Sequence, residues 1–498
     1  MQEQYEELKR RLQEVNDLQS ANALLGWDQA TYMPAKGAAA RGRQISTLSR
    51  LAQEKFTDPA IGHLLDELEK HDLPYDSDEA SLIRVTRRLY ERSIKVPPEF
   101  TAKIAAHSTE AFSLWAKSRP ENNFSAVQEN LEKTLDMSME YANFFPGYDH
   151  IADPLIDGSD YGMKAESIRQ IFTELREQLV PIAKAISEQE TTDDSCLRKH
   201  FPIDKQQEFG EYVIQQFGYD FERGRQDKTH HPFMTKFSLN DVRITTRFQE
   251  NFLGESLGST MHEAGHALYE LGINQDYEGT PLARGTSAGV HESQSRLWEN
   301  VVARSRGFWE YFYGPLQETF KGVLDDVSLD DFYRAVNKVQ PSFIRVEADE
   351  VSYCLHIMLR FDMEKDLMTG KLAVKDAPEA WNAKMEEYLG IVPETDTLGI
   401  LQDVHWSSGI LGYFPTYALG TLLSAQLYYR ALEDHPTIPD EIRQGKFSTL
   451  LSWMNDNIHV HGRKYMPAEL IQRATSKPLG HQDYMTYLRG KFGPIYNL

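Results

Sequence analysis

The chain has 498 residues and a net charge of −22 at neutral pH, from 75 acidic and 53 basic residues. This acidic balance argues against a protein that binds nucleic acid or anionic membranes, because both partners need a basic surface. With 41% hydrophobic residues the composition is that of a globular protein, and two cysteines, Cys196 and Cys354, are too few for a disulfide framework or a four-thiolate zinc site.

The N-terminal segment MQEQYEELKRRLQEVNDLQ is charged from its third residue. It lacks the apolar core of a signal peptide, and no later stretch reaches the roughly 18 uninterrupted apolar residues of a membrane-spanning helix. Together with the low cysteine content, this pattern predicts a cytoplasmic protein.

Helical periodicity dominates the chain. Tyr5, Leu8, Leu12 and Val15 recur at the i, i+3, i+4 spacing of an amphipathic helix. Similar stretches occupy most of 36–145, 163–189, 346–368 and 417–457. Because no strong linker separates the halves, we predict a mostly α-helical protein with a single large domain over 1–498. Residues 1–145 are expected to form an N-terminal helical layer.

One region departs from the helical pattern. From His231 to Phe248 apolar and polar residues alternate around an Asn240-Asp241 turn. This pattern predicts a β-hairpin or a pair of short strands, and we expect a small β element over 228–247. An irregular loop is the alternative interpretation.

The most informative motif is His262-Glu263-Ala-Gly-His266. The apolar residues around it fall on one stripe of an ideal helix, which leaves the two histidines one turn apart on the opposite face, where they can share one metal ion. Glu263 is offset from His262 by about 100°, as a general base for metal-bound water should be. The alternative is an exposed helix face that carries two histidines by chance.

A catalytic zinc site takes three protein ligands and leaves one position for water. Glu292, near the start of a second predicted helix, is the leading candidate for the third ligand. Glu299 lies two turns further along nearly the same face and competes with it, and His291 is a third option. An ordinary acidic residue in a first helical turn is the alternative for Glu292. We expect the metal-binding helices over 254–300, and amide hydrolysis is the chemistry that fits such a site.

Six motifs occur in a fixed order along the chain. They are His231-Pro232-Phe233, Asp241-Val-Arg243-Ile-Thr245, His262-Glu263-Ala-Gly-His266, His291-Glu292-Ser293-Gln294, Ile344-Arg345-Val-Glu-Ala348-Asp349 and Gly399-Ile-Leu-Gln402-Asp403-Val-His405-Trp406. In these motifs, and over nearly its whole length, the sequence resembles the Taq-type thermostable metallocarboxypeptidases of bacteria, archaea and some protozoa.

The resemblance implies a nearly all-α fold with a deep central active-site groove, similar to angiotensin-converting enzyme and neurolysin-like peptidases. It also implies one zinc or cobalt ion, a homodimer, and removal of single C-terminal residues with broad specificity from peptides with a free C-terminus. By motif position, His262, His266 and Glu292 are the metal ligands and Glu263 is the base.

A carboxypeptidase must also hold the free carboxylate of its substrate. Arginine suits this task because its planar, always charged fork binds carboxylate bidentately. The resemblance assigns this role to Arg345, with Arg243 as a second candidate, and places His231 among the substrate-binding residues. Pairing with a neighbour is the alternative for each arginine, with Asp349 for Arg345 and Asp241 for Arg243.

Three residues near the last motif are candidates for stabilising the tetrahedral oxyanion. His405 offers a hydrogen bond to the oxyanion or to the substrate backbone, and Tyr413 and Tyr417 are candidate oxyanion donors. A packing role is the alternative for either tyrosine. The predicted hairpin offers an edge with which extended substrate can pair, and Phe233 is then either a subsite wall or core.

Three functions are compatible with this sequence. The leading hypothesis is a zinc-dependent carboxypeptidase. An oligoendopeptidase would use the same zinc helix but has no arginine for a terminal carboxylate. A non-catalytic, metal-bound peptide-binding or scaffold protein is disfavoured, because it would have no need of Glu263.

The stretch Arg223–Arg247 is locally basic, with six basic against two acidic residues. An acidic protein should repel a substrate that is recognised by its carboxylate. Together with the metal ion and Arg345, this stretch is therefore a candidate cationic island that attracts the substrate.

Overall fold

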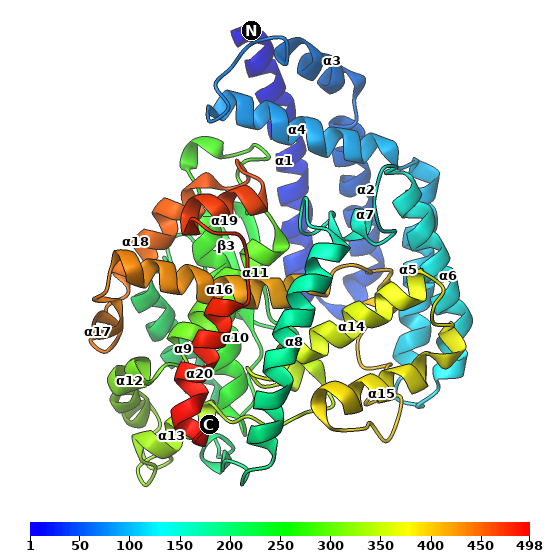
Figure 1. Ribbon diagram of the computed structural model, residues 1–498. Helices are drawn as coiled ribbons and strands as arrows, with labels where there is room; N and C mark the ends of the chain where they lie inside the picture. The colour runs from blue at the N-terminus through cyan, green and yellow to red at the C-terminus, as the bar shows by residue number, and fades with distance from the viewer. The chain divides into compact units, whose positions relative to one another are not determined.

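The computed structural model describes residues 1–498, which form two compact units (Figure 1). Each unit is assembled from three separate segments. Unit 1 contains 1–94, 194–336 and 427–477, and unit 2 contains 95–193, 337–426 and 478–498. The predicted mostly α-helical fold is confirmed, and the helices expected over 1–145 are present but are shared between the two units.

Unit 1 holds the only β-sheet and most of the N-terminal helices. Its α-helices are α1 (Gln2–Thr31), α2 (Ala38–Phe56), α3 (Pro59–Leu68), α4 (Asp78–Lys95), α9 (Ile203–Phe217), α10 (Leu253–Leu271), α11 (Ala288–Arg296), α12 (Arg306–Thr319), α13 (Leu329–Val336), α17 (Ile438–Ile442), α18 (Ser448–Asn457) and α19 (Pro467–Thr475). A π-helical turn, η4 (Leu297–Val302), follows α11 directly.

Unit 2 is entirely helical. Its helices are α5 (Pro98–Ser118), α6 (Phe124–Asn143), α7 (Asp153–Ile156), α8 (Ala165–Ser187), α14 (Tyr353–Met368), α15 (Ala377–Leu389) and α20 (Gln482–Tyr496), and α16 (Pro415–Asp434) contributes to both units. Short 3₁₀ turns, η5 (Arg345–Glu347) and η7 (Trp406–Ser408), lie in its connecting segments.

The N-terminal helices of unit 1 pack through the apolar stripe that their sequence predicts. Leu8 and Leu12 of α1 are buried in one cluster with Ile61 and Leu65 of α3. Helix α3 begins where Asp58 accepts a hydrogen bond from a backbone N–H of its first turn, with a proline at the first helical position. In Figure 1 α1 and α2 run side by side.

The predicted hairpin is confirmed and belongs to a three-stranded sheet. Strands β2 (Phe233–Ser238) and β3 (Asp241–Thr246) pair antiparallel, with Thr235 opposite Arg243. A strand absent from the prediction, β1 (Gln226–Lys228), pairs parallel to β3, so the order is β1-β3-β2. β2 is therefore an edge strand, and it lies against α10.

Helices α10 and α11 cross unusually closely at Gly265. A Cβ atom built at this position would lie 2.6 Å from the carbonyl oxygen of Gln294 and 2.7 Å from the Cα of Ser295. Only glycine fits at this crossing, because real Cβ atoms do not approach backbone so closely. The glycine inside the His-Glu-x-x-His motif therefore brings the helix of Glu292 against the helix of the two histidines.

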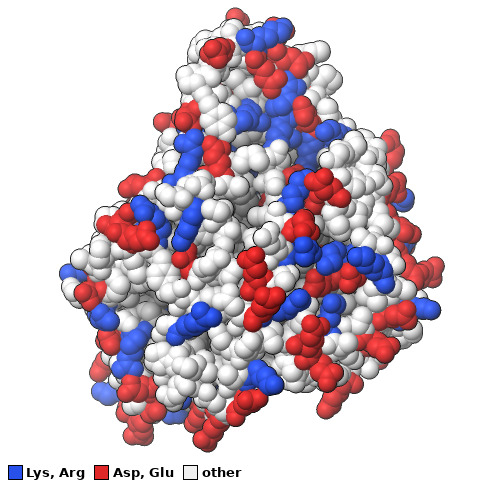
Figure 2. Space-filling model, viewed as in Figure 1, with Lys and Arg blue, Asp and Glu red and all other residues white.

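The surface carries both signs of charge. Acidic and basic side chains lie interspersed on the face drawn in Figure 2. Many are paired, as Arg87 is with Asp66 and Glu69. None of the helices combines the length and the apolar character that crossing a bilayer requires.

Candidate metal and substrate sites

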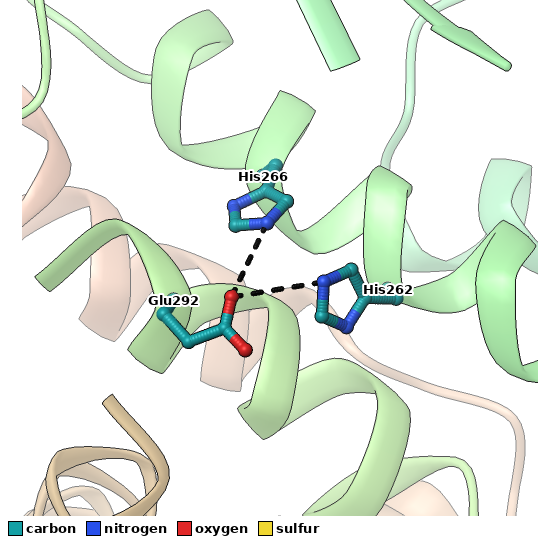
Figure 3. Close-up of side chains that lie close together, drawn as sticks. All are labelled: His262, His266 and Glu292. Carbon is teal, nitrogen blue, oxygen red and sulfur yellow. Dashed lines mark ion pairs between the residues drawn. The ribbon is translucent and has the colours of Figure 1, made fainter. Parts of the chain in front are cut away.

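Two helices of unit 1 bring His262, His266 and Glu292 together (Figure 3). One ligand atom from each lies within 4.8 Å of the others. The Nε2 atoms of His262 and His266 lie 3.7 and 3.6 Å from Oε2 of Glu292. The three side chains that the spacing singled out therefore converge on one point.

The donors fit a tetrahedral zinc or cobalt ion. Zn–N and Zn–O bonds of about 2.0–2.1 Å place neighbouring ligand atoms about 3.3 Å apart, close to the distances between these side chains. The second oxygen of Glu292 is held by Arg296, whose Nε donates to Oε1 at 2.7 Å. Oε2 is thereby turned toward the two imidazoles.

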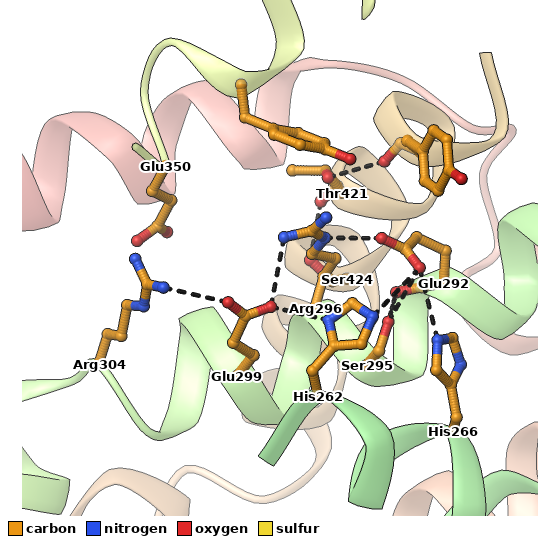
Figure 4. Close-up of polar contacts among 12 residues, drawn as sticks. His262, His266, Glu292, Ser295, Arg296, Glu299, Arg304, Glu350, Thr421 and Ser424 are labelled. Atoms are coloured by element: carbon orange, nitrogen blue, oxygen red, sulfur yellow. Dashed lines mark hydrogen bonds and ion pairs between the residues drawn. The ribbon is translucent and has the colours of Figure 1, made fainter. Parts of the chain in front are cut away.

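Glu299 lies on the outer side of the His262 ring (Figure 4). Its Oε2 lies 2.8 Å from Nδ1 of His262, and its carboxylate also binds Arg296 and Arg304. Burial alone would raise the pKa of Glu299, but the charge of Arg296 and the hydrogen bond from His262 hold it below the usual range. A carboxylate can only accept here, so Nδ1 of His262 carries the proton and Nε2 keeps its lone pair for a metal.

Glu299 lies seven residues after Glu292, which separates the two residues by about 10 Å along a helix even where they share one face. It lies within the π-helical segment Leu297–Val302. Glu292 therefore meets the Nε2 side of His262 and Glu299 meets its Nδ1 side.

A second chain of contacts orients His266. Its Nδ1 lies 2.7 Å from Nδ1 of His291, and Nε2 of His291 lies 2.9 Å from Oε1 of Glu270. Glu270 is also bound by Lys236 of β2. Because Glu270 accepts from His291, a neutral His291 accepts from His266, which leaves Nε2 of His266 free for the metal.

Glu263 is buried beside the triad, with 6% of its surface exposed. Burial raises the pKa of Glu263 to about 7; the charge of His262 opposes this rise, and those of Glu292 and Glu299 add to it. The backbone N–H of Met234 in β2 donates to its carboxylate. A carboxylate with a pKa near neutrality is suited to take and return a proton.

The other predicted residues of unit 1 lie on and beside the sheet. Arg243 donates to both oxygens of Asp241 at 2.8 Å, as the structural alternative predicts, and its guanidinium lies over the rings of Trp27 and Phe237. These contacts favour a structural role for Arg243. His231 is exposed just before β2, and Phe233 is half-buried at its start.

The locally basic stretch 223–247 is offset by acidic neighbours in the fold. Arg225 pairs with Asp227 and Arg243 with Asp241 inside the stretch. Two further pairs use acids outside it: Lys236 binds Glu270, and Arg247 lies 3.4 Å from Glu255. These two outside acids neutralise half of the surplus of four positive charges that the sequence suggested.

Arg345 lies in a buried cluster of unit 2. Its Nε and Nη2 donate to Oδ1 of Asp403 at 3.1 and 2.9 Å, and Nη1 donates to Tyr353. Arg360 donates through Nε to the second oxygen of Asp403 at 2.6 Å. The partner of Arg345 is therefore Asp403 and not Asp349, which instead accepts from backbone N–H groups at the start of α14.

His405, Tyr413 and Tyr417 gather beside this cluster. Nε2 of His405 lies 3.4 Å from the hydroxyl of Tyr417, and the two tyrosine rings are 5.4 Å apart between centroids. The guanidinium of Arg345 lies 5.2 Å from the centre of the Tyr417 ring. Unit 2 thus brings the candidate carboxylate binder and the candidate oxyanion donors together.

Several residues with clear roles were absent from the sequence prediction. Glu270 lies one turn after His266 and Arg296 one turn after Glu292, so the i, i+4 spacing was an available signal for both. Asp403 lay inside a recognised motif. No local sequence pattern pointed to Arg360, because its partner Asp403 is distant in the sequence.

Comparison with known proteins identifies the family. The profile of the family described as carboxypeptidase Taq (M32) metallopeptidase matches residues 7–492. The chain belongs to the M32 metallocarboxypeptidase family. It is 39% identical to thermostable carboxypeptidase 1 of Thermus thermophilus over 504 residues, covering 99% of each chain. It is 36% identical to carboxypeptidase 1 of Bacillus subtilis, covering 98% of this chain and 97% of that protein.

Solved M32 structures have the same fold. The crystal structure of the M32 carboxypeptidase from Deinococcus radiodurans R1 superposes with a TM-score of 0.97 at 45% identity, covering 99% of this chain and all of that one. The resemblance read from the six motifs is confirmed, and so are the helical fold and the metallocarboxypeptidase class.

Proposed function

We propose that this M32 carboxypeptidase is a zinc enzyme that removes single C-terminal residues from peptides with broad specificity. In this proposal His262, His266 and Glu292 hold the ion. The proposal is supported by the orientation of both Nε2 atoms toward Oε2 of Glu292. Cobalt suits the same donors and is the second ion to test.

The reaction is hydrolysis of the last peptide bond. Bound zinc would polarise the scissile carbonyl and lower the pKa of the attacking water. Glu263 takes a proton from this water and passes it to the leaving amine. His405, Tyr413 and Tyr417 are proposed to donate hydrogen bonds to the oxyanion.

The observation that carries the C-terminal specificity is that two buried guanidinium groups, Arg345 and Arg360, share the carboxylate of Asp403. Burial lowers the pKa of Arg360 to about 10; the charge of Arg345 lowers it further, and the charge of Asp403 opposes both effects. A substrate carboxylate would be a further acceptor for this pair of guanidinium groups.

Arg345 also retains donors for such a carboxylate. A guanidinium has five N–H groups, and three of those on Arg345 donate to Asp403 and Tyr353. Two N–H groups remain for the substrate. Arg243 and His231 stay secondary proposals for substrate contacts, since Arg243 is committed to Asp241.

We further propose that the protein is located in the cytoplasm and forms a homodimer. Neither cysteine forms a disulfide and both are buried, which is compatible with a reducing compartment. The homodimer follows from the family resemblance alone. Sedimentation of the metal-loaded protein measures the oligomeric state, and a monomer at micromolar concentration would contradict the proposed homodimer.

One peptide synthesised with a free and with an amidated C-terminus tests the function. We expect release of single residues from the free form only, and a loss of about a hundredfold in kcat/KM for Arg345→Ala on that form. Equal cleavage of the amidated peptide, or internal fragments, would instead indicate an oligoendopeptidase.

The role of Glu263 is tested separately. Glu263→Gln is expected to keep the metal, measured by elemental analysis, and to lose activity. If both metal and activity survive this change, Glu263 is not the base. The activities of the wild-type protein loaded with zinc and with cobalt compare the two ions.

A further inference from the structure

Helix α14 of unit 2 carries two oppositely charged buried residues one turn apart, Arg360 and Glu364. Arg360 binds the first two residues of the segment that begins at Gln402. Its Nη2 donates to the side-chain oxygen of Gln402 at 2.7 Å, and its Nε donates to Asp403. The catalytic roles proposed above make no use of Glu364.

Glu364 holds the same segment at two further points. Its Oε1 accepts from the indole N–H of Trp406 at 2.7 Å, and its Oε2 accepts from the backbone N–H of Gly412 at 2.9 Å. These two points lie between His405, which directly precedes Trp406, and Tyr413, which directly follows Gly412.

The backbone conformation at Gly412 makes this contact possible. Gly412 has a φ of +76°, and a Cβ atom there would lie 2.8 Å from Cβ of Leu155 and 2.9 Å from the backbone nitrogen of Ile156. The backbone therefore approaches helix α7 as closely as glycine permits. A bound Gly412 N–H fixes the chain immediately before Tyr413.

We propose that Glu364 is a positioning residue whose ionised carboxylate fixes the segment that carries His405 and Tyr413, and that protonation of Glu364 releases this segment. The inference rests on the proposed roles of His405 and Tyr413. Glu364 itself touches neither of them, so it acts through Trp406 and Gly412.

The chemistry of the two partners explains the dependence on ionisation. An indole N–H and a backbone N–H only donate, so a carboxylate satisfies both. Protonation weakens this contact, because the oxygen that takes the proton becomes a poorer acceptor than a carboxylate oxygen and adds a donor beside the two N–H groups.

Burial, and not the charge of Arg360, brings the titration of Glu364 near neutral pH. Burial raises the pKa of Glu364 to about 7, against the two N–H bonds and the charge of Arg360. The charge of Arg360 is in turn shared with Asp403, and His405 lies 3.8 Å from Asp403. On the helices packed against α14, Arg176 of α8 pairs with Asp362, and the charge of Lys384 of α15 acts on the same carboxylate. Glu364 is therefore charged above about pH 7, where the segment is held, and neutral below it.

The decisive measurement follows the indole N–H of Trp406 by nitrogen-15 NMR in the full-length, zinc-loaded enzyme. Its signal is assigned by its loss in Trp406→Phe. We expect this signal to titrate with a midpoint near pH 7 in the wild type and to show no such titration in Glu364→Gln. A Trp406 signal that stays unchanged across this range would overturn the proposal.

Activity supplies the second measurement. At about pH 8, Glu364→Gln is expected to lower kcat about ten- to a hundredfold with little change in KM or zinc content, and Glu364→Asp to restore part of kcat. Asp362→Asn on the same helix is the control, because it breaks the pair with Arg176 and leaves the segment held. An unchanged kcat in Glu364→Gln, or an equal loss in Asp362→Asn, would contradict the inference.

The two proposals fail in different ways. A zinc-loaded wild type that removes no C-terminal residue contradicts the proposed function whatever the Trp406 signal does. If Glu364→Gln does not fold, the wild-type titration and Glu364→Asp still decide the role of Glu364.

Discussion

Oε2 of Glu299 lies 2.8 Å from Nδ1 of His262, whereas Nε2 of the same ring lies 3.7 Å from Glu292. The two carboxylates that competed for the third ligand position therefore occupy opposite sides of one imidazole. This arrangement favours Glu292 as the ligand and Glu299 as the residue that orients His262. Such second contacts to ligand histidines tune both geometry and basicity.

The two glutamates should differ in their effect on metal binding. Glu299→Gln is expected to weaken zinc affinity by about 10- to 100-fold and to leave a one-to-one complex, because the ligand set is intact. Glu292→Gln is expected to lose stoichiometric zinc. Competition with a chromophoric chelator measures both affinities. The reverse order of the two losses would identify Glu299 as the ligand.

Glu270 should influence the metal from a greater distance. Glu270→Gln replaces an acceptor by a group that can donate to Nε2 of His291, which reverses the hydrogen-bond order toward His266. We expect zinc affinity to fall by about tenfold or more. Glu278→Gln, which changes a glutamate bound to the backbone N–H of Leu239, is the matched control. Unchanged affinity in Glu270→Gln would show that His291 does not fix the tautomer of His266.

Gly265→Ala should separate the two metal-binding helices. The added methyl group would lie 2.6 Å from a backbone oxygen of α11, so the helices must shift, at a cost of about 1–3 kcal/mol. Zinc affinity should fall with stability, because Glu292 moves with α11. Gly258→Ala on the same helix meets only ordinary contacts, the nearest at 3.6 Å, and should keep the zinc. Equal behaviour of the two variants would contradict this reading of Gly265.

Removing the charge of Glu263 should stabilise the protein at alkaline pH. Burial raises the folded-state pKa of Glu263 from 4.5 to about 7, so its ionised form costs about 3 kcal/mol. This cost is absent below about pH 4.5 and complete above about pH 7. EDTA-treated Glu263→Gln should therefore unfold at a higher temperature than wild type at pH 8, with a much smaller difference at pH 5. The exposed exchange Glu318→Gln is the control, and an equal gain from it would contradict the argument.

Asp403→Asn should destabilise unit 2. The change leaves the buried guanidinium groups of Arg345 and Arg360 without their shared carboxylate, which costs about 3–5 kcal/mol. Burial by itself raises the pKa of Asp403, but the two arginines hold it below the usual range, so its stabilisation is present above about pH 4 and is lost in acid.

Chemical unfolding at about pH 7 and pH 3 measures this loss. The difference between wild type and Asp403→Asn should shrink at the lower pH. Asp349→Asn is the comparison, because Asp349 binds backbone N–H groups and no arginine. A larger effect at Asp349 would contradict the assignment of Asp403 as the partner of Arg345.

The sequence by itself determined the features that depend on local spacing. The 3.6-residue period predicted the helices, alternation predicted the β2–β3 hairpin, and the spacing of the two histidines predicted two of the three proposed metal ligands. The pairing of Arg243 with Asp241, two residues away on one strand, was also available as an alternative. Each of these relationships joins residues close in the chain, where backbone geometry fixes their relative positions.

Only the tertiary structure decided the relationships that join distant segments. The placement of Glu292 and Glu299 on opposite sides of His262 depends on how α10 packs across α11 and the π-helical segment that follows it. Asp403, far along the chain, replaced Asp349 as the partner of Arg345, because a buried charge pairs with whichever opposite charge the packing brings near. The acids that neutralise the basic stretch 223–247 likewise include Glu270 and Glu255, which only the fold brings to Lys236 and Arg247.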